Sequence, residues 1–424
     1  MTKTILICTV GGSHKPIVKA IESTKPHLVC FVCSDDDLST GNKGSYTQIS
    51  GKGLCIKENH DELKPSLPNI PSQVGLPEDQ FEIILVRPDD LSHVCEQIQA
   101  WLKQQESEST QFIADYTGGT KTMTAGLVTV ALQDERVQLQ LITGPRSDLR
   151  QVRANHGSST RARVENLRIQ QQLEGALELW KHHGYAEAAQ LTKRIINPQE
   201  AILSARLEQV RSASQALADW DCFQHQLALD HLQDYRRIFA EPWTDFYNLL
   251  GKLTSADEGT RELFQLFDLW RNAQRRATAG RFDDAVSRWY RLVEGSAQWI
   301  LQHKVGIDTA NVPADKIPPE LNLTSDKEGN YKVASTNAWK LVSIYGPEQA
   351  QKFWRQEEER LRDYQNRRNH SILAHGFRPI SQEDWSLLSD WTDGQLIPLL
   401  FSFAQEQPNR MKALPSQLPR EFPL

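Results

Sequence analysis

The feature that most constrains the fold is a change of pattern near residue 164 of this 424-residue chain. Before it, short runs rich in β-branched residues alternate with helical patterns, which is typical of a parallel sheet with helices on both faces. The predicted strands are Thr4 to Val10, His27 to Cys33, Phe81 to Val86, Gln111 to Asp115 and Val137 to Ile142. We therefore predict a Rossmann-like α/β domain at the N-terminal end.

After residue 164, long stretches of Leu, Gln, Glu, Arg and Ala repeat apolar residues at helical spacing, and almost no strand candidates remain. We expect an all-α C-terminal region. An Arg-rich stretch at 146 to 163 is typical of a domain junction. The predicted domains are 1–150, a helical linker domain at 151–270 and a second helical domain at 271–424. Residues 34 to 80 form a polar insertion, and 305 to 337 form a Pro-bearing loop.

Composition excludes several classes of protein. Hydrophobic residues make up 39% and charged residues 24%, which indicates a chain that folds throughout. The net charge of -6 excludes a general nucleic-acid coat protein, so any RNA contact needs a local basic patch. Cys30 and Cys33 lie in HLVCFVC, where strand periodicity places them on opposite faces and argues against a metal site. No apolar run reaches the ~18 residues that span a bilayer, and we expect a cytoplasmic protein.

Two glycine-containing turns follow predicted strands at the edge where open α/β sheets bind ligands. The first holds Gly11, Gly12, Ser13, His14 and Lys15, and the second holds Thr117, Gly118, Gly119, Thr120, Lys121 and Thr122. Each combines glycines, hydroxyls, a cation and a following helix N-terminus, which suits a phosphate. One such turn alone can be only a tight connection, but two matched turns favour an anion-binding crevice. Neither turn completes a P-loop or a dinucleotide fingerprint.

The segment from Pro347 to Ala374 predicts one long charged helix that ends at Gly376 in a left-handed conformation. Seven residues separate Arg368 from His375, so a helix would place both on one face, about 10 Å apart. That distance is long for two side chains on one phosphate. A compact site would draw the same pair from a second copy, and we therefore predict a homodimer.

The residue types in this segment suit cleavage of RNA. Arg368 can hold a phosphate by forked hydrogen bonds, His375 can act as an acid or phosphate binder, and Asn369 can orient the substrate. RNA supplies its own nucleophile in the 2′-hydroxyl, so no metal is needed. A basic helix end without any activity has the same spacing, because cations are favourable at a helix C-terminus. Spacing alone leaves both interpretations open.

Three segments carry a resemblance to a known family. RNHSILAHG resembles the Arg-x(4-6)-His motif of HEPN ribonucleases, including the Asn that often follows the Arg. TVGGSHKP and DYTGGTKTM resemble the ligand-binding loops of CARF domains. FDDAVSRWYRLVEGSAQWIL is similar to the opening helix of the HEPN part of CRISPR-associated CARF-HEPN proteins. These similarities cover both ends of the chain and leave roughly 160 to 270 unassigned.

The resemblance implies an effector of type III CRISPR antiviral defence, with a HEPN domain at 271–424. A cyclic oligoadenylate would bind across the CARF dimer and activate metal-independent cleavage of single-stranded RNA at Arg368, Asn369 and His375. A cyclic tetra-adenylate fits a C2 dimer by symmetry. Some CARF domains also cleave their activator slowly, and Ser13, Thr117 or Lys121 would serve that role here.

Two other classes remain as alternatives. The chain can be a CARF-type ligand-sensing regulator whose helices only bind a partner, although no short recognition-helix pattern occurs in the α-region. A metal-dependent nuclease would need clustered carboxylates and a lysine on paired strands, and the sequence after residue 160 contains no such set.

Overall fold

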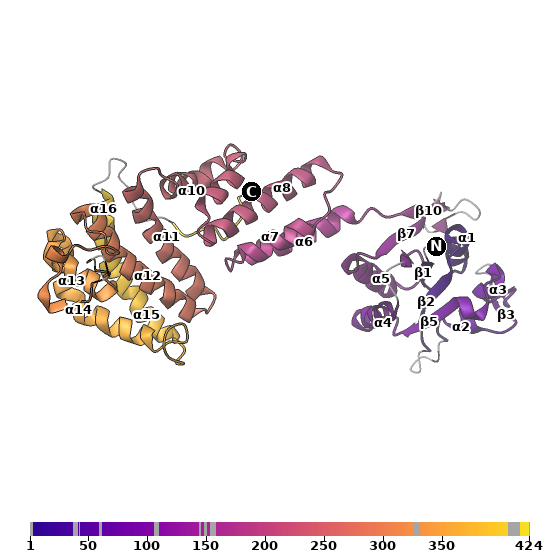
Figure 1. Cartoon of the computed structure of the whole chain (residues 1–424). Coiled ribbons are helices and arrows are strands. Elements are labelled where there is room, and N and C mark those ends of the chain that lie inside the picture. The colour runs from indigo at the N-terminus through magenta and orange to yellow at the C-terminus, as the bar shows by residue number, and fades with distance from the viewer. Residues whose placement is uncertain are drawn as a thin grey trace. The chain divides into compact units, whose positions relative to one another are not determined.

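The computed structural model describes residues 3–36, 41, 43–58, 62–105, 110–143, 146–147, 151–152, 158–321, 323–325, 327, 329, 331–405 and 416–423. The chain divides into two compact units, Met1–Ile169 and Gln170–Leu424 (Figure 1). The first is α/β and the second is helical, so the predicted fold class is confirmed. The separation of 151–270 from 271–424 stays a prediction, and the junction at 146–163 lies partly outside the described residues.

The first unit contains a six-stranded sheet in the order β10-β7-β6-β1-β2-β5. Its parallel strands are β1 (Lys3–Thr9), β2 (Leu28–Ser34), β5 (Phe81–Val86), β6 (Thr110–Asp115) and β7 (Val137–Thr143). These confirm all five predicted strands. An unpredicted edge strand, β10 (Ser158–Arg161), pairs antiparallel with β7. A two-stranded ribbon of β8 (Arg146–Ser147) and β9 (Gln151–Val152) lies in the same unit.

Helices cover both faces of this sheet. Helices α4 (Leu91–Gln104) and α5 (Lys121–Gln133) pack on one core with Cys30, and α1 (Lys15–Thr24) packs on the other core with Cys33. The two cysteines therefore lie on opposite faces, as predicted. Strand β1 is flanked by β2 and β6, and the chain order reverses between β1 and β6. This reversal is the switch point at which open α/β sheets bind ligands.

The insertion at 34 to 80 folds into small elements at the carboxyl end of β2. They are α2 (Thr47–Ser50), β3 (Leu54–Ile56), β4 (Leu67–Pro68), α3 (Ile70–Val74) and a 3-10 turn, η1 (Glu78–Gln80). Ser34 and Ser45 fasten its start, since the backbone N–H of each donates to the hydroxyl of the other, at 2.9 and 2.8 Å. The beginning of the insertion is thus held beside the ligand edge.

The second unit is built from helices that begin with α6 (Glu165–Trp180), whose first residues belong to the first unit. The others are α7 (Tyr185–Arg194), α8 (Ala201–Asp221), α9 (His225–Gln233), α10 (Ala240–Leu253), α11 (Glu258–Thr278), α12 (Phe282–Ile300), α13 (Ser335–Tyr345), α14 (Glu348–Asn369), α15 (Gln382–Trp391) and α16 (Ile397–Gln405). Two π-helical turns, η2 (Leu301–Val305) and η5 (Thr392–Leu396), extend α12 and precede α16. The described part of the predicted loop at 305 to 337 contains the end of η2, the short 3-10 turns η3 (Ala314–Lys316) and η4 (Pro319–Leu321), an isolated bridge between Val312 and Tyr331, and the start of α13.

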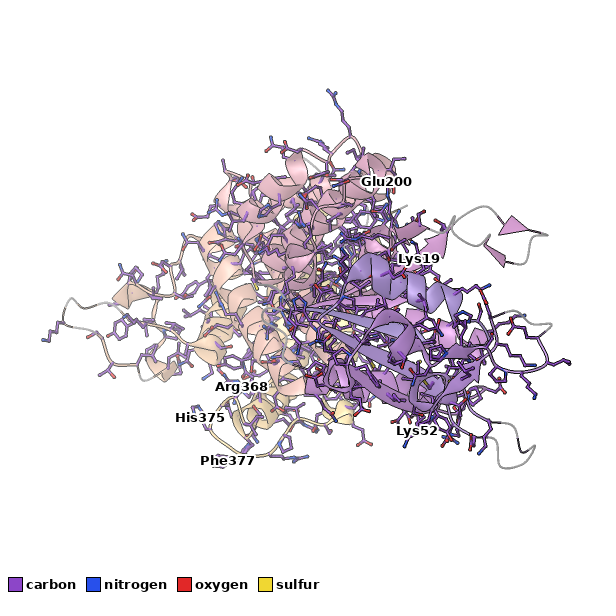
Figure 2. The ribbon with its side chains drawn as sticks, turned by 90° about the vertical axis from the view of Figure 1, so that its right-hand side faces the viewer. Lys19, Lys52, Glu200, Arg368, His375 and Phe377 are labelled. Carbon is purple, nitrogen blue, oxygen red and sulfur yellow. The ribbon has the colours of Figure 1, made fainter. Side chains whose placement is uncertain are left out.

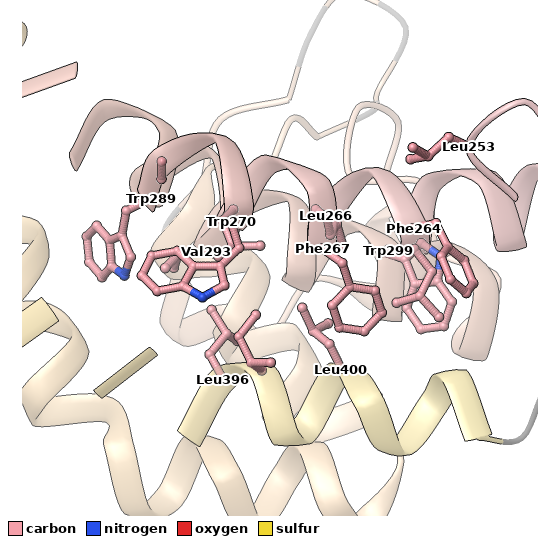
Figure 3. Packing of buried hydrophobic residues seen from close by; sticks show 14 of the residues in the cluster. Leu253, Phe264, Leu266, Phe267, Trp270, Trp289, Val293, Trp299, Leu396 and Leu400 are labelled. Carbon is pink, nitrogen blue, oxygen red and sulfur yellow. The ribbon is translucent and has the colours of Figure 1, made fainter. Parts of the chain in front are cut away.

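Buried tryptophans form much of the second core. Figure 3 shows Trp270 of α11 facing the leucines of η5 and α16. The indole N–H groups are satisfied, as buried tryptophans require. Trp289 donates to the Thr392 hydroxyl at 2.9 Å, and Trp339 donates to the Val293 carbonyl at 3.0 Å. These bonds fix the mutual positions of α12, α13 and η5, which frame the C-terminal site.

Residues 416–423, which we call the C-terminal strap, pack back onto the first helices of this unit. The Phe422 ring lies 5.6 Å from Trp180 and 5.6 Å from Phe239, centroid to centroid. The Tyr185 hydroxyl donates to the Pro419 carbonyl at 2.9 Å. The strap therefore ties the end of the chain to α6, α7 and α10.

Candidate functional site

The two glycine turns meet at the switch point of the sheet. A Cβ on Gly11 would lie 2.7 Å from the backbone nitrogen of Gly119 and 2.9 Å from its Cα, so the two turns touch backbone to backbone. Gly119 has a φ of +87°, a conformation that favours glycine. The two glycines therefore permit an approach that larger residues would block. The expected juxtaposition of the turns is present.

Both turns end in a helix N-terminus. Helix α1 begins at Lys15, and α5 begins at Lys121, where the Thr120 hydroxyl caps the backbone N–H of Met123 at 3.2 Å. Free N–H groups and the helix dipole favour an anion at such ends. Gly12, Ser13, Lys15 and Lys121 are exposed and so available to a ligand.

Other predicted residues of this crevice form hydrogen bonds within the fold or are buried. The Thr117 hydroxyl accepts from the Ile142 N–H at 2.8 Å, and the Thr120 hydroxyl donates to the Pro88 carbonyl at 2.8 Å. His14 is buried, and its burial together with neighbouring Lys15 lowers its pKa. These side chains shape the turns.

Gln48 is a residue of the crevice that sequence reasoning missed. It lies on α2 in the insertion, and its side-chain amide donates to the Gly11 carbonyl at 2.6 Å. Nothing in the local sequence distinguishes this glutamine, because the contact joins residues 37 positions apart. The insertion thereby supports the first turn directly.

The C-terminal motif differs from the predicted continuous helix. Helix α14 ends at Asn369, and residues 372–375 form a turn. The N–H of His375 donates to the Asn369 carbonyl at 3.1 Å, which folds the turn back against the helix end. The predicted continuous helix to Ala374 is therefore wrong, and the separation of about 10 Å that was derived from it stays a prediction without that helix as its basis. Gly376 is not a left-handed helix cap, because it lies outside the positive-φ glycines.

Gly376 is needed for a different reason. A Cβ there would lie 2.1 Å from the carbonyl oxygen of His370, so only glycine lets the chain pass this close. Before the turn, Ser371 is buried, with 1% of its surface exposed. After the turn, the N–H of Arg378 donates to the His370 carbonyl at 3.2 Å. The motif is thus a tightly held turn at the end of a helix.

Arg368 lies flat over an aromatic ring. Its guanidinium carbon is 4.2 Å from the centroid of Tyr290 on α12, a cation–π contact. One terminal nitrogen donates to the Asn369 side-chain oxygen at 3.3 Å, and the buried Nε has no partner among the described residues. The guanidinium therefore rests on the ring, with no carboxylate partner in the part of the chain that the structure describes. Asn369 and His375 beside it are exposed.

Three other arginines of this helix face acidic side chains. Arg360 pairs with Glu357 at 3.1 Å, Arg362 pairs with Glu358 at 2.6 Å, and Arg367 reaches Asp384 at 3.0 Å. His370 contacts the Asn366 carbonyl at 2.8 Å and stays on the surface. Arg368 differs from the three paired arginines in having an aromatic ring beneath it.

Comparisons with known proteins match part of the second unit to a known domain family and the whole chain to a solved fold. Residues 258–395 match the model of the Csm6 HEPN domain, a range that includes α12, α14 and the motif. The chain also has the fold of Enterococcus italicus Csm6, solved bound to cyclic hexa-2′-fluoro-hexa-dAMP, with a TM-score of 0.57 and 13% identity over 96% of both chains. No curated protein matches the sequence.

The family match shows that residues 258–395 are similar to the HEPN domain of Csm6, and the likeness to the Enterococcus protein, at 13% identity, is one of fold. The HEPN family of Csm6 consists generally of ribonucleases. Within the described residues, no group of three or more His, Cys, Asp or Glu side chains is placed to hold a metal ion. None of the described helices is long and apolar enough to cross a membrane.

Proposed function

We propose that this protein is a cytoplasmic, homodimeric endoribonuclease that cyclic oligoadenylate activates and that cleaves single-stranded RNA without a metal in type III CRISPR defence. The observation that carries the proposal is the cluster of Arg368, Asn369 and His375 at the end of α14. Two of its members are exposed, and the third is a guanidinium held over Tyr290, with no acidic partner among the described residues.

In the proposed reaction the 2′-oxygen of the substrate attacks the adjacent phosphorus. The 2′-hydroxyl loses its proton, a 2′,3′-cyclic phosphate forms, and the 5′-oxygen leaves with a proton. Arg368 stabilises the negative charge on the phosphoryl oxygens, and its stacking on Tyr290 reduces the entropy lost when it binds. His375 moves the proton, and Asn369 orients the phosphate or the histidine.

A dimer would supply a second copy of His375 at the proposed site, which one protomer lacks. The reaction removes one proton and delivers another, which two copies of His375 can share at one site. Ile372 and Leu373, inside the motif, are 51% and 49% exposed, so the turn offers apolar surface to a second copy. Two-fold symmetry would bring the two motifs together.

The activator is assigned to the crevice between the two glycine turns of the first unit. Exposed backbone at Gly12, the helix ends at Lys15 and Lys121, and the exposed Ser13 suit phosphates linked in a ring. We propose a cyclic tetra-adenylate on symmetry grounds and also propose slow cleavage of the activator there, supported by Ser13, Thr117 or Lys121. Because the Enterococcus protein was solved with a six-membered analogue, both ring sizes belong in the test.

The test mixes purified protein with labelled single-stranded RNA in EDTA, with and without cyclic tetra- or hexa-adenylate. Wild type should cleave only with an activator, and His375→Ala should be inactive. His370→Ala is the matched control, because this exposed histidine lies in the same segment and its ring bonds to the Asn366 carbonyl at the helix end. Full activity of His375→Ala would refute the site. Activator binding without cleavage by wild type would indicate a ligand-sensing regulator instead.

A further inference from the structure

Phe377 is an aromatic side chain that the motif does not account for. It is 97% exposed and lies two residues after His375. Two residues of extended chain span at most about 7 Å, so the ring originates close to the proposed reaction site. In Figure 2, Arg368, His375 and Phe377 lie at the same margin of the second unit.

The exposure of this ring is imposed by a well-held backbone. Gly376, directly before it, passes against the His370 carbonyl, and Arg378, directly after it, bonds to that same carbonyl at 3.2 Å. The N–H of Ile380, a buried residue three positions after Phe377, donates to the Asp283 carboxylate at 3.2 Å. Phe377 is therefore presented to solvent from a segment fixed on both sides, which limits the entropy lost when a ligand covers the ring.

Arg378 and His375 flank the ring in the chain, and the same turn also exposes the apolar Ile372 and Leu373. Arg378 has 77% of its side chain exposed and only a distant 3.9 Å contact to Asp384, and exposed His375 lies on the other side. Aromatic rings among cations are typical of surfaces that bind single-stranded nucleic acid, because bases stack on the rings while cations follow the phosphates. The core of a protein interface is instead depleted of charged residues.

We propose that Phe377 is a substrate-binding residue that stacks on the nucleobase next to the cleaved phosphate. The proposal rests on the ribonuclease function of the same motif. A base can stack in this way only when it is unpaired, so Phe377 would make the site selective for single-stranded RNA. Such a contact holds the substrate and takes no part in the proton transfers.

The experiment measures RNA binding and cleavage separately. Binding of a labelled single-stranded RNA is followed by fluorescence anisotropy in the presence of activator, in the His375→Ala background. We compare Phe377→Ala, Phe377→Tyr and, as a control, Leu387→Ala, which removes a half-exposed leucine from α15. Base stacking is worth about 1–3 kcal/mol, so Phe377→Ala should raise Kd by about 5- to 150-fold. Phe377→Tyr and the control should bind as the parent does.

A substrate lacking one base gives the sharper readout. In proteins with intact His375, Phe377→Ala should raise KM more than it lowers kcat. An RNA with an abasic nucleotide on one or the other side of the cleaved bond should be bound equally by wild type and Phe377→Ala. Equal Kd values on ordinary RNA would overturn the inference. So would dissociation of the Phe377→Ala dimer in light scattering, because the ring would then belong to the interface between copies.

Failure of the proposed function has a different signature. If wild type cleaves no RNA with either activator, the ribonuclease assignment fails, and the anisotropy comparison still decides whether Phe377 binds RNA. If wild type cleaves and Phe377→Ala has unchanged KM, only the stacking inference fails.

Discussion

Replacing Gly11 by alanine tests whether the two glycine turns form one ligand site. The added methyl group would lie 2.7 Å from the Gly119 nitrogen, against an ordinary contact of at least 3.4 Å, so the turns must separate by roughly 0.7 Å. They cannot do so freely. The Gly118 carbonyl accepts from the Thr9 hydroxyl at 2.6 Å, and the Gly11 carbonyl accepts from Gln48.

The magnitude follows from this overpacking. Forcing a methyl group into a packed site typically costs about 1–3 kcal/mol. For a unit of this size, each kcal/mol lowers Tm by about 2–4 °C. We therefore expect the first unit of Gly11→Ala to unfold about 2–12 °C lower than in wild type. Activator affinity should fall by about tenfold or more, because widening the crevice weakens hydrogen bonds to charged phosphate, each worth about 1.5–3 kcal/mol.

The neighbouring glycine provides the control. A Cβ on Gly12 would meet nothing within 4 Å, and its φ is not positive, so Gly12→Ala should keep the Tm of wild type. Thermal unfolding by calorimetry and titration with cyclic oligoadenylate measure both quantities. The reasoning is refuted if Gly11→Ala unfolds at the Tm of Gly12→Ala and binds activator with the affinity of wild type.

Three other expectations concern single side chains. Lys121→Glu should weaken activator binding in calorimetry, because it places an anion at the start of α5, whereas the control Lys103→Glu on α4 should not. Equal affinities of the two variants would show that the activator binds at another site. Phe422→Ala should lower the free energy of unfolding of the second unit by about 2 kcal/mol in denaturant unfolding, since the ring packs on two aromatic rings. An unchanged denaturation midpoint would show that the C-terminal strap does not stabilise the unit. Burial, with nearby arginines, lowers the pKa of His183 from 6.5 to about 4. As pH falls, His183 is therefore protonated in the unfolded chain before it is protonated in the folded protein. The free energy of unfolding then decreases as pH drops from 6.5 to about 4, and His183→Gln should flatten this dependence of Tm on pH.

The sequence predicted those secondary-structure elements whose positions depend on local residue patterns. The five parallel strands are apolar runs, so their positions follow from sequence. Strand β10 has four exposed, mostly polar residues and pairs with β7 through its backbone, which leaves no apolar pattern to detect. The contact of Gln48 with Gly11 likewise depends on a fold that brings distant residues together.

The end of α14 shows the same limit at the proposed active site. Residues 348–375 contain no proline or glycine, and the helical pattern runs on to Gly376. The helix stops early because Ser371 becomes buried and the chain returns past His370 through Gly376. The residue types of the motif could be recognised from the sequence. Their arrangement on a turn, and the Tyr290 ring beneath Arg368, required the tertiary structure.

The chemistry of the product ends tests the central claim most directly. RNA cleaved by the activated protein in EDTA is analysed by mass spectrometry. Attack by the 2′-hydroxyl at the Arg368 and His375 site predicts 2′,3′-cyclic phosphate on one fragment and a 5′-hydroxyl on the other, with neither formed by His375→Ala. Fragments with 5′-phosphate and 3′-hydroxyl ends, or cleavage that appears only when magnesium is added, would contradict the account.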